Sequence, residues 1–133
     1  MNPKVSIIIG NWNGKEYLKD CLKSVFDQQY LNFKVILVDN GSVDNSLEFV
    51  KKNYSAVEII SLDKNYGFAK ANNIGIKHAL KKYNPSYVLL QNNDTILLKD
   101  NAFTELINVF KIHLLELLLL KLYIQMEGYN AER

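Results

Sequence analysis

The sequence predicts an α/β fold in which a doubly wound, mostly parallel sheet is covered by helices on both faces. The chain contains short apolar runs rich in β-branched residues, such as VSIII at 5–9 and VILV at 35–38. The segments between these runs carry apolar residues at helical spacing. Because the two kinds of segment alternate, and near-continuous apolar strands are typical of parallel sheets, the pattern favours this class.

The first half of the chain is predicted to contain two strands and two helices. The strands are the apolar runs 5–9 and 35–38, and the turn NWNG follows the first of them. From residue 15 onwards, apolar residues recur at one face of a helix. In the loop DNGSVDNS, Asp44 or Asn45 can cap a second helix near 47–53.

The second half repeats this alternation. Strands are expected at 57–62 and 87–90, and a last helix is expected to begin near 100–102. The helix between the two strands is expected to direct Ile76, Ala79, Leu80 and Tyr83 towards the core. Pro85 ends that helix, because proline cannot continue it. Right-handed crossovers between parallel strands then give a doubly wound layer.

Composition limits the classes of protein to which the chain can belong. Its 133 residues are enough for one domain, and 48% hydrophobic with 23% charged residues is typical of a globular chain. A net charge of +2 with interspersed signs offers no basic patch for nucleic acid. Cys21 is the only cysteine, which excludes an intrachain disulfide, and it is expected to be a buried thiol. The N-terminus lacks a signal-peptide pattern, so we expect a cytoplasmic protein.

Polar residues gather directly after each predicted strand. GNWN stands at 10–13, DNGS at 39–42, NYG at 65–67 and NND at 92–94. In parallel sheets ligands bind outside the carboxyl ends of the strands, so these clusters are expected to share one crevice. The dinucleotide fingerprint GxGxxG and the phosphate loop GxxxxGK[ST] do not occur, and the amide-rich strand ends do not suit a phosphoacceptor receiver.

Four residues in these clusters suggest a chemistry, and each has a purely structural alternative. Trp12 can stack on a nucleobase or cap the end of the sheet. Asp39 can accept hydrogen bonds from a base or ribose, or bond the backbone of its own turn. Gly67 opens a helix whose free N–H groups favour phosphate, or is a simple helix start. Asp94 can bind Mg²⁺ or Mn²⁺ together with a diphosphate, or cap the next segment.

Four stretches resemble the family 2 glycosyltransferases in order and spacing: PKVSIIIGNWNGKEYLKDCLKSV, FKVILVDNGSVDNS, NYGFAKANNIGI and YVLLQNNDT. The resemblance covers about residues 3–110 and is strongest for the branch often called rhamnosyltransferase-like, which carries Asn-Asn-Asp-Thr in place of the Asp-x-Asp metal motif. It implies a Rossmann-like GT-A fold. It also implies an enzyme that transfers a sugar, with inversion, from a nucleoside-diphosphate donor to a glycan or lipid-linked acceptor in cell-surface polysaccharide or glycan synthesis.

The resemblance also implies roles for individual residues. The implied nucleotide-sugar contacts are Trp12, Asp39, Asn65, Gly67, Asn73 and Asn93. Asp94 matches the last carboxylate of the metal motif, and Asn92 replaces its first aspartate, so Mg²⁺ or Mn²⁺ would be held by these two residues. Asn72 stands where the family often has an arginine, so one phosphate-binding charge is absent. The general base belongs to an acceptor half that is not in this chain.

The predicted organisation is a nucleotide-sugar-binding α/β domain at 1–110 and a leucine-rich helical tail at 111–133 that is atypical for the family. Six leucines stand between 114 and 120. The tail is interpreted as a truncated or frame-shifted end, as a helix that covers the sheet or pairs with a second copy or partner chain, or as a peripheral membrane contact. The apolar run within the tail is too short to span a bilayer, and it carries Glu116 and Lys121.

Two functions of different class follow. The chain is either the donor half of a sugar transferase or a catalytically incomplete nucleotide-sugar-binding module that needs a partner chain. A purely structural protein, which binds no nucleotide, is a third alternative.

Overall fold

The computed structural model describes residues 2–112 of the chain. They form, in chain order, β1 (Val5–Asn11), α1 (Lys15–Phe26), β2 (Phe33–Asp39), α2 (Ser46–Asn53), β3 (Glu58–Ser61), α3 (Phe68–Tyr83), β4 (Tyr87–Asn92) and α4 (Ala102–Ile112). One compact unit ends at Asp100 and contains everything up to β4, while α4 belongs to a second unit. The predicted tail at 111–133 lies almost wholly outside the described residues, so the predicted domain division stays a prediction.

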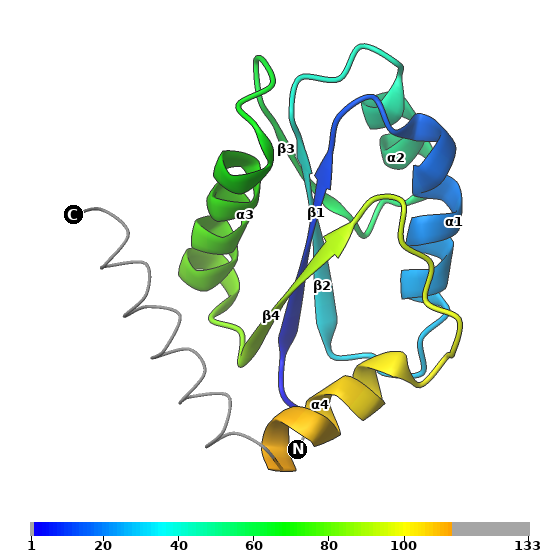
Figure 1. The fold of residues 1–133 in the computed structure, drawn as a ribbon, viewed down its shortest axis with the longest axis vertical. Helices are drawn as coiled ribbons and strands as arrows, with labels where there is room; N and C mark the ends of the chain where they lie inside the picture. The colour runs from blue at the N-terminus through cyan, green and yellow to red at the C-terminus, as the bar shows by residue number, and fades with distance from the viewer. Residues whose placement is uncertain (1, 113–133) are drawn as a thin grey trace, which may run out of the picture. The chain divides into compact units, whose positions relative to one another are not determined.

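The four strands form one parallel sheet in the order β3-β2-β1-β4. In Figure 1, α3 lies on one face of this sheet and α1 and α2 lie on the other. The predicted doubly wound α/β fold is therefore confirmed. The chain order of the strands reverses between β1 and β4, and this is the position at which ligands bind in open α/β sheets.

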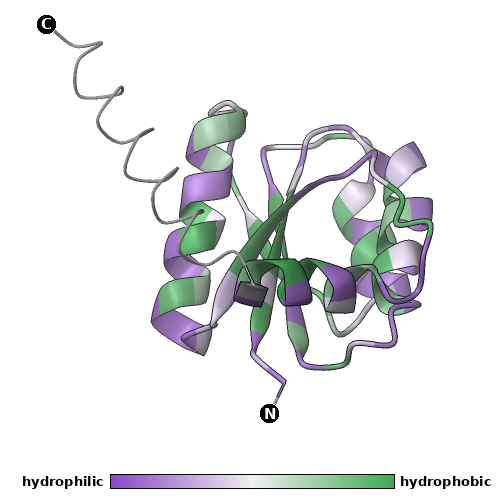
Figure 2. Cartoon of the chain, turned by 60° about the horizontal axis from the view of Figure 1, so that its bottom comes forward, coloured by the Kyte–Doolittle hydropathy of each residue, from purple (hydrophilic) through white to green (hydrophobic). Residues whose placement is uncertain are grey.

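The core consists of the two central strands and the helix faces turned towards them. Residues 7–9 of β1 and 36–38 of β2 are fully buried, which explains why these runs are continuously apolar. Cys21 is fully buried as predicted, and burial raises the pKa of its thiol to about 11. Figure 2 shows the hydrophobic strands between helices that have both hydrophobic and hydrophilic segments.

The helix α3 packs on the sheet through small residues. Ala71, Gly75 and Ala79 are buried, and the helix lies so close that a Cβ on Gly75 would be 2.5 Å from Ile8 Cγ2. Leu80, predicted to face the core, is 52% exposed, so that prediction was wrong. Fewer residues of α3 are buried than its apolar pattern predicted. The helix lies so close to the strands that only small side chains fit between them.

A charged cluster joins β3, an edge strand of the sheet, to the end of α3. Glu58 Oε1 accepts hydrogen bonds from His78 Nε2 and from Lys82 Nζ, both at 2.6 Å, and Tyr83 donates to the other carboxylate oxygen. Burial raises the pKa of Glu58, but these hydrogen bonds outweigh burial and lower it to about 2.

Within residues 2–112, no helix combines the length and the apolar character needed to cross a bilayer.

Candidate functional site: a polar rim at the carboxyl ends of the strands

The carboxyl ends of all four strands meet at one edge of the sheet. The register places Asn11 beside Asp39, Gly10 beside Asn92, and Asp39 beside Ser61. The strands β1 and β4 each extend two residues further than apolarity predicted, because ladder pairing with a neighbouring strand continues through Asn11 and Asn92. We call the polar residues at these ends and in the loops that follow them the rim.

Asp39 lies at the end of β2 and is only 1% exposed. Its Oδ1 accepts hydrogen bonds from Asn11 Nδ2 at 2.9 Å and from Ser42 Oγ at 2.6 Å, and its Oδ2 accepts one from the Ser42 backbone N–H at 3.0 Å. These bonds satisfy a buried carboxylate that would otherwise be costly. The turn-bonding alternative stated for Asp39 is therefore part of its role, and three of its roughly four acceptor positions are used by the rim itself.

Asn11 connects Asp39 to the turn after β4. Asn11 is 2% exposed, and its Oδ1 accepts a hydrogen bond from Asn93 Nδ2 at 2.9 Å. This contact spans the position at which the strand order reverses. Asp39 and Asn93, both predicted to belong to the nucleotide-sugar site, are thus joined through one intervening amide.

Asn40 connects the end of β2 to the loop before α3. Its Nδ2 donates to Asn65 Oδ1 at 2.8 Å, and its Oδ1 accepts from the Tyr66 N–H at 2.9 Å. Asn65 Oδ1 also accepts from the Gly67 N–H at 2.8 Å, so the predicted pair Asn65 and Gly67 forms one loop. Gly67 has φ +86°, a conformation that side chains rarely adopt, which explains glycine at the start of α3.

Trp12 lies in the turn after β1 and is 56% exposed. The turn is held to the loop after β2, because the Asn13 N–H donates to Ser42 Oγ at 2.9 Å and the Val43 N–H donates to Asn13 Oδ1 at 2.9 Å. An exposed indole on an anchored turn is available for stacking on a flat ligand.

In the first turns of α3, the two adjacent asparagines occupy different environments. Asn73 is exposed, whereas Asn72 is buried and lies against β1 at Gly10, with its Nδ2 donating to the Phe68 carbonyl at 3.0 Å. Lys70 extends over the Tyr66 ring at 4.0 Å from its centroid and carries a positive charge beside the same loop.

Asp94 and Asn92 are both exposed at the end of β4. The chain turns here, because the Thr95 N–H donates to the Asn92 carbonyl at 3.2 Å. Within residues 2–112, no three side chains among His, Cys, Asp and Glu gather into a metal site. Among these four residue types in the described part of the chain, Asp94 therefore has no partner group of this kind, and the neighbouring oxygen donors are the amides of Asn92 and Asn93.

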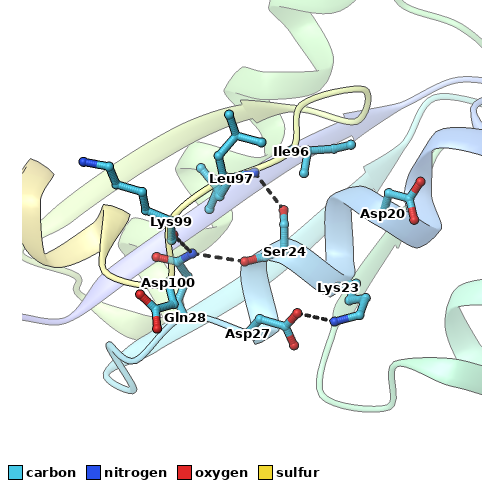
Figure 3. Close-up of a pocket in the computed structure, with 10 residues that line it drawn as sticks. Asp20, Lys23, Ser24, Asp27, Gln28, Ile96, Leu97, Lys99 and Asp100 are labelled. Atoms are coloured by element: carbon cyan, nitrogen blue, oxygen red, sulfur yellow. Dashed lines mark hydrogen bonds and ion pairs between the residues drawn. The ribbon is translucent and has the colours of Figure 1, made fainter.

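The segment after Asp94 is fastened to α1. Ser24 Oγ accepts from the Leu97 N–H at 3.0 Å, and Gln28 Nε2 donates to the Lys99 carbonyl at 2.7 Å (Figure 3). A cavity of about 330 Å³ lies between α1 and this segment, and its lining residues come from 20–28 and 96–100. The cavity is therefore not lined by any of the predicted site residues.

Sequence reasoning selected residues at every strand end but missed those that connect them, namely Asn11, Asn40 and Ser42. All three belong to the clusters GNWN and DNGS that the sequence indicated. Burial would have identified the two asparagines, because a buried asparagine must find hydrogen-bond partners among its neighbours, but burial cannot be read from the sequence.

Comparison with known proteins assigns the chain to a family. The model of glycosyl transferase family 2 matches residues 6–126. The teichoic acid poly(glycerol phosphate) polymerase of Staphylococcus epidermidis is 34% identical over 84 residues, which are 60% of this chain and 12% of the polymerase. The poly-beta-1,6-N-acetyl-D-glucosamine synthase of the same species is 32% identical over 102 residues, 74% of this chain and 24% of the synthase. The chain thus spans only a small part of these relatives.

Solved glycosyltransferase structures share the fold. S. aureus TarS 1–349 in complex with UDP-GlcNAc superimposes with a TM-score of 0.70 at 25% identity, over 83% of this chain and 32% of TarS. The mannosyltransferase PcManGT from Pyrobaculum calidifontis, in complex with GDP-Man and Mn²⁺, gives 0.66 at 20% identity, over 75% of this chain and 30% of that protein. With its four-stranded parallel sheet of GT-A type and a family match over most of its length, the chain belongs to glycosyl transferase family 2.

Proposed function

We propose that the chain binds a nucleoside-diphosphate sugar at the rim and supplies the donor site for an inverting glycosyl transfer. The observation that carries this proposal is a pair of side-chain hydrogen-bond sets, one from Asn93 through Asn11 to Asp39 and one from Asn40 to Asn65. The two sets are linked because the Asn40 backbone N–H donates to the Asn11 carbonyl at 2.7 Å. Together they organise the ends of all four strands into one polar surface. Sugar nucleotides bound to TarS and PcManGT support the ligand class.

The proposed contacts follow the chemistry of the rim. Trp12, exposed on its anchored turn, stacks on the base. Asp39 holds the loop after β2 and offers its remaining acceptor position to the base or ribose. Gly67 precedes α3, where backbone N–H groups and the helix dipole favour phosphate, and the exposed Asn73 lies in the second turn of the same helix. Asn65 shapes the same loop.

Asn92 and Asp94 fit a hard divalent cation by the chemistry of their donors. Both are exposed and offer oxygen atoms, which Mg²⁺ and Mn²⁺ prefer. With a single charged ligand, the protein would bind the metal together with a diphosphate rather than alone. When bound, the cation would neutralise charge on the departing diphosphate.

The residues of this chain have binding and positioning roles in the proposed reaction. The acceptor hydroxyl attacks the anomeric carbon, the bond to the diphosphate oxygen breaks, and the nucleoside diphosphate leaves. The proton of the hydroxyl passes to a general base, which we place in an acceptor half outside this chain. The N-terminus of α3 stabilises the negative charge that develops on the leaving group.

The proposed setting is cell-surface polysaccharide or glycan synthesis, with a glycan or lipid-linked acceptor and a location in the cytoplasm or at the membrane surface. The names of the teichoic acid polymerase and of the N-acetylglucosamine polymer synthase support this setting. A second candidate is a nucleotide-sugar-binding module completed by a partner chain, which nucleotide binding without turnover would favour.

Calorimetric titration tests the proposal. UDP, GDP and dTDP are titrated with and without Mn²⁺, and sugar-nucleotide hydrolysis and transfer are assayed in parallel. Binding with turnover supports the transferase, and binding without turnover supports the module. Absence of binding to every nucleotide contradicts both.

A further inference from the structure

We infer that Asn11 is a positioning residue through which the charge of Asp39 sets the orientation of the Asn93 amide, next to Asp94. This inference rests on the proposed function, because it links the nucleotide side of the rim to the side that would bind a cation. Among residues 2–112, Asn11 is the one side chain that forms hydrogen bonds with the side chains of both Asp39 and Asn93.

The direction of each hydrogen bond follows from Asp39. An ionised carboxylate only accepts hydrogen bonds, so Asn11 must present its NH₂ group to Asp39. Its carbonyl oxygen then faces Asn93, which must present its own NH₂ group in return. The distances from Asn11 Nδ2 to Asp39 Oδ1 and from Asn93 Nδ2 to Asn11 Oδ1 are both 2.9 Å, an ordinary hydrogen-bond length. One charge therefore determines the orientation of two amides in series.

The direction of these hydrogen bonds decides which atom of the Asn93 amide is left for a ligand at the turn. With its nitrogen committed to Asn11, the Asn93 side chain has its carbonyl oxygen left to offer to a ligand. An oxygen beside the Asp94 carboxylate suits a cation, whereas an NH₂ group there would suit an anion. Asp39 thus favours a cation at a turn that it does not contact.

Gly14 supplies an independent observation that this contact requires space. A Cβ at this position would lie 2.1 Å from Asn93 Nδ2 and 2.7 Å from Asn11 Oδ1. The backbone there has φ −111°, which any residue adopts, so backbone conformation does not require glycine. The space beside Gly14 is occupied by the amide–amide contact itself.

The first test measures the contact without any ligand. Side-chain amide signals of Asn93 are followed by ¹⁵N NMR in wild type, in Asp39→Asn and in the exchanged pair Asn11→Asp with Asp39→Asn. We expect Asp39→Asn to shift the Asn93 signals and to accelerate their hydrogen exchange, and the exchanged pair to restore both. Asp44→Asn is the matched control, because Asp44 also accepts backbone hydrogen bonds after β2 but from Lys15 and Ser46. Unchanged Asn93 signals in Asp39→Asn would overturn the inference.

The second test separates metal-dependent from metal-independent binding, with UDP and Mn²⁺ as probes. In Gly14→Ala, we expect the gain in UDP affinity caused by Mn²⁺ to fall about tenfold, as for other groups that orient metal ligands, while affinity without metal stays at the wild-type value. Gly10→Ala is the control, because its Cβ would meet Asn72 only at ordinary contact distances of 3.7 and 3.9 Å. An equal loss with and without metal contradicts the inference.

The two tests distinguish failure of the inference from failure of the proposed function. If wild type binds no UDP but the Asn93 signals respond to Asp39→Asn, the proposed function fails and the orienting role of Asn11 stands. If UDP binds and the Asn93 signals do not respond, the function stands and the inference fails.

Discussion

Substitution of Gly75 by alanine places two known effects in opposition. Gly75 lies in the middle of α3, where alanine would favour the helix by about 1 kcal/mol. The new Cβ would however lie 2.5 Å from Ile8 Cγ2 and 2.8 Å from Val38 Cγ2. Both methyl groups belong to β-branched residues on buried strands, whose side chains rotate with difficulty.

The steric effect is expected to be larger than the gain in helix propensity. Ordinary contact begins at 3.4 Å, so α3 must move outward by about 1 Å, which loosens the contacts of Ala71 and Ala79 as well. Overpacking of this kind costs about 1–3 kcal/mol, and the rigidity of the site favours the upper end. The expected net loss is about 2 kcal/mol, or a fall in Tm of roughly 8 °C for a chain of this size.

Urea and thermal unfolding of wild type and Gly75→Ala measure this difference. Lys77→Ala and Lys77→Gly, at an exposed position of the same helix, give the propensity effect without the clash. A Gly75→Ala variant that is as stable as wild type, or more stable, would refute the close packing of α3 on β1 and β2.

Three further predictions concern single side chains. The pKa of Glu58 is lowered from 4.5 to about 2, so its contribution to stability is complete above pH 4.5 and is lost as pH falls towards 2. The stability difference between wild type and Glu58→Gln should therefore close over this range in acid titrations, and a constant difference would contradict the role of the cluster. The Cys21 thiol, buried and with a raised pKa, should resist Ellman's reagent at pH 8 until guanidinium unfolds the chain, and rapid reaction of the native protein would exclude its burial. Asp94→Ala should leave Tm unchanged, because the side chain is exposed, and weaken UDP binding in the presence of Mn²⁺ by about tenfold, whereas unchanged affinity would exclude Asp94 from the proposed metal site.

The alternation of strands and helices was predictable because it follows from local periodicity. The first helix, Lys15–Phe26, begins where the apolar spacing indicated, and both central strands were recognised from their β-branched runs. Asp44, one of two suggested caps for α2, accepts the Ser46 N–H, whereas Asn45 adopts a left-handed backbone and makes no side-chain cap. The preference for Asp or Asn before a helix identified where α2 begins. Which of the two side chains accepts the backbone hydrogen bond depended on the conformation of the loop.

The rim illustrates the opposite case. Polar clusters follow every predicted strand, and this pattern predicted that Asp39, Gly67 and Asn93 belong to one edge of the sheet. The register confirms that the strand ends align. The partners of each residue were not predictable, because Asn11 and Asn93 are separated by 82 positions and contact each other only through strand order. For the same reason, the exposure of Leu80 and the burial of Asn72 differ from what their polarity suggests.

By itself, the order of residues determined the class of fold, the positions of its elements and the edge of the sheet at which polar groups collect. These properties depend on spacing along the chain, which sets the face of a helix or strand that a side chain occupies. Only the tertiary structure decided which polar groups meet, because hydrogen-bond partners and burial depend on strand order and on how closely the layers pack. The orientation of the Asn11 and Asn93 amides is a property of this second kind, since it requires Asp39 to be adjacent in space.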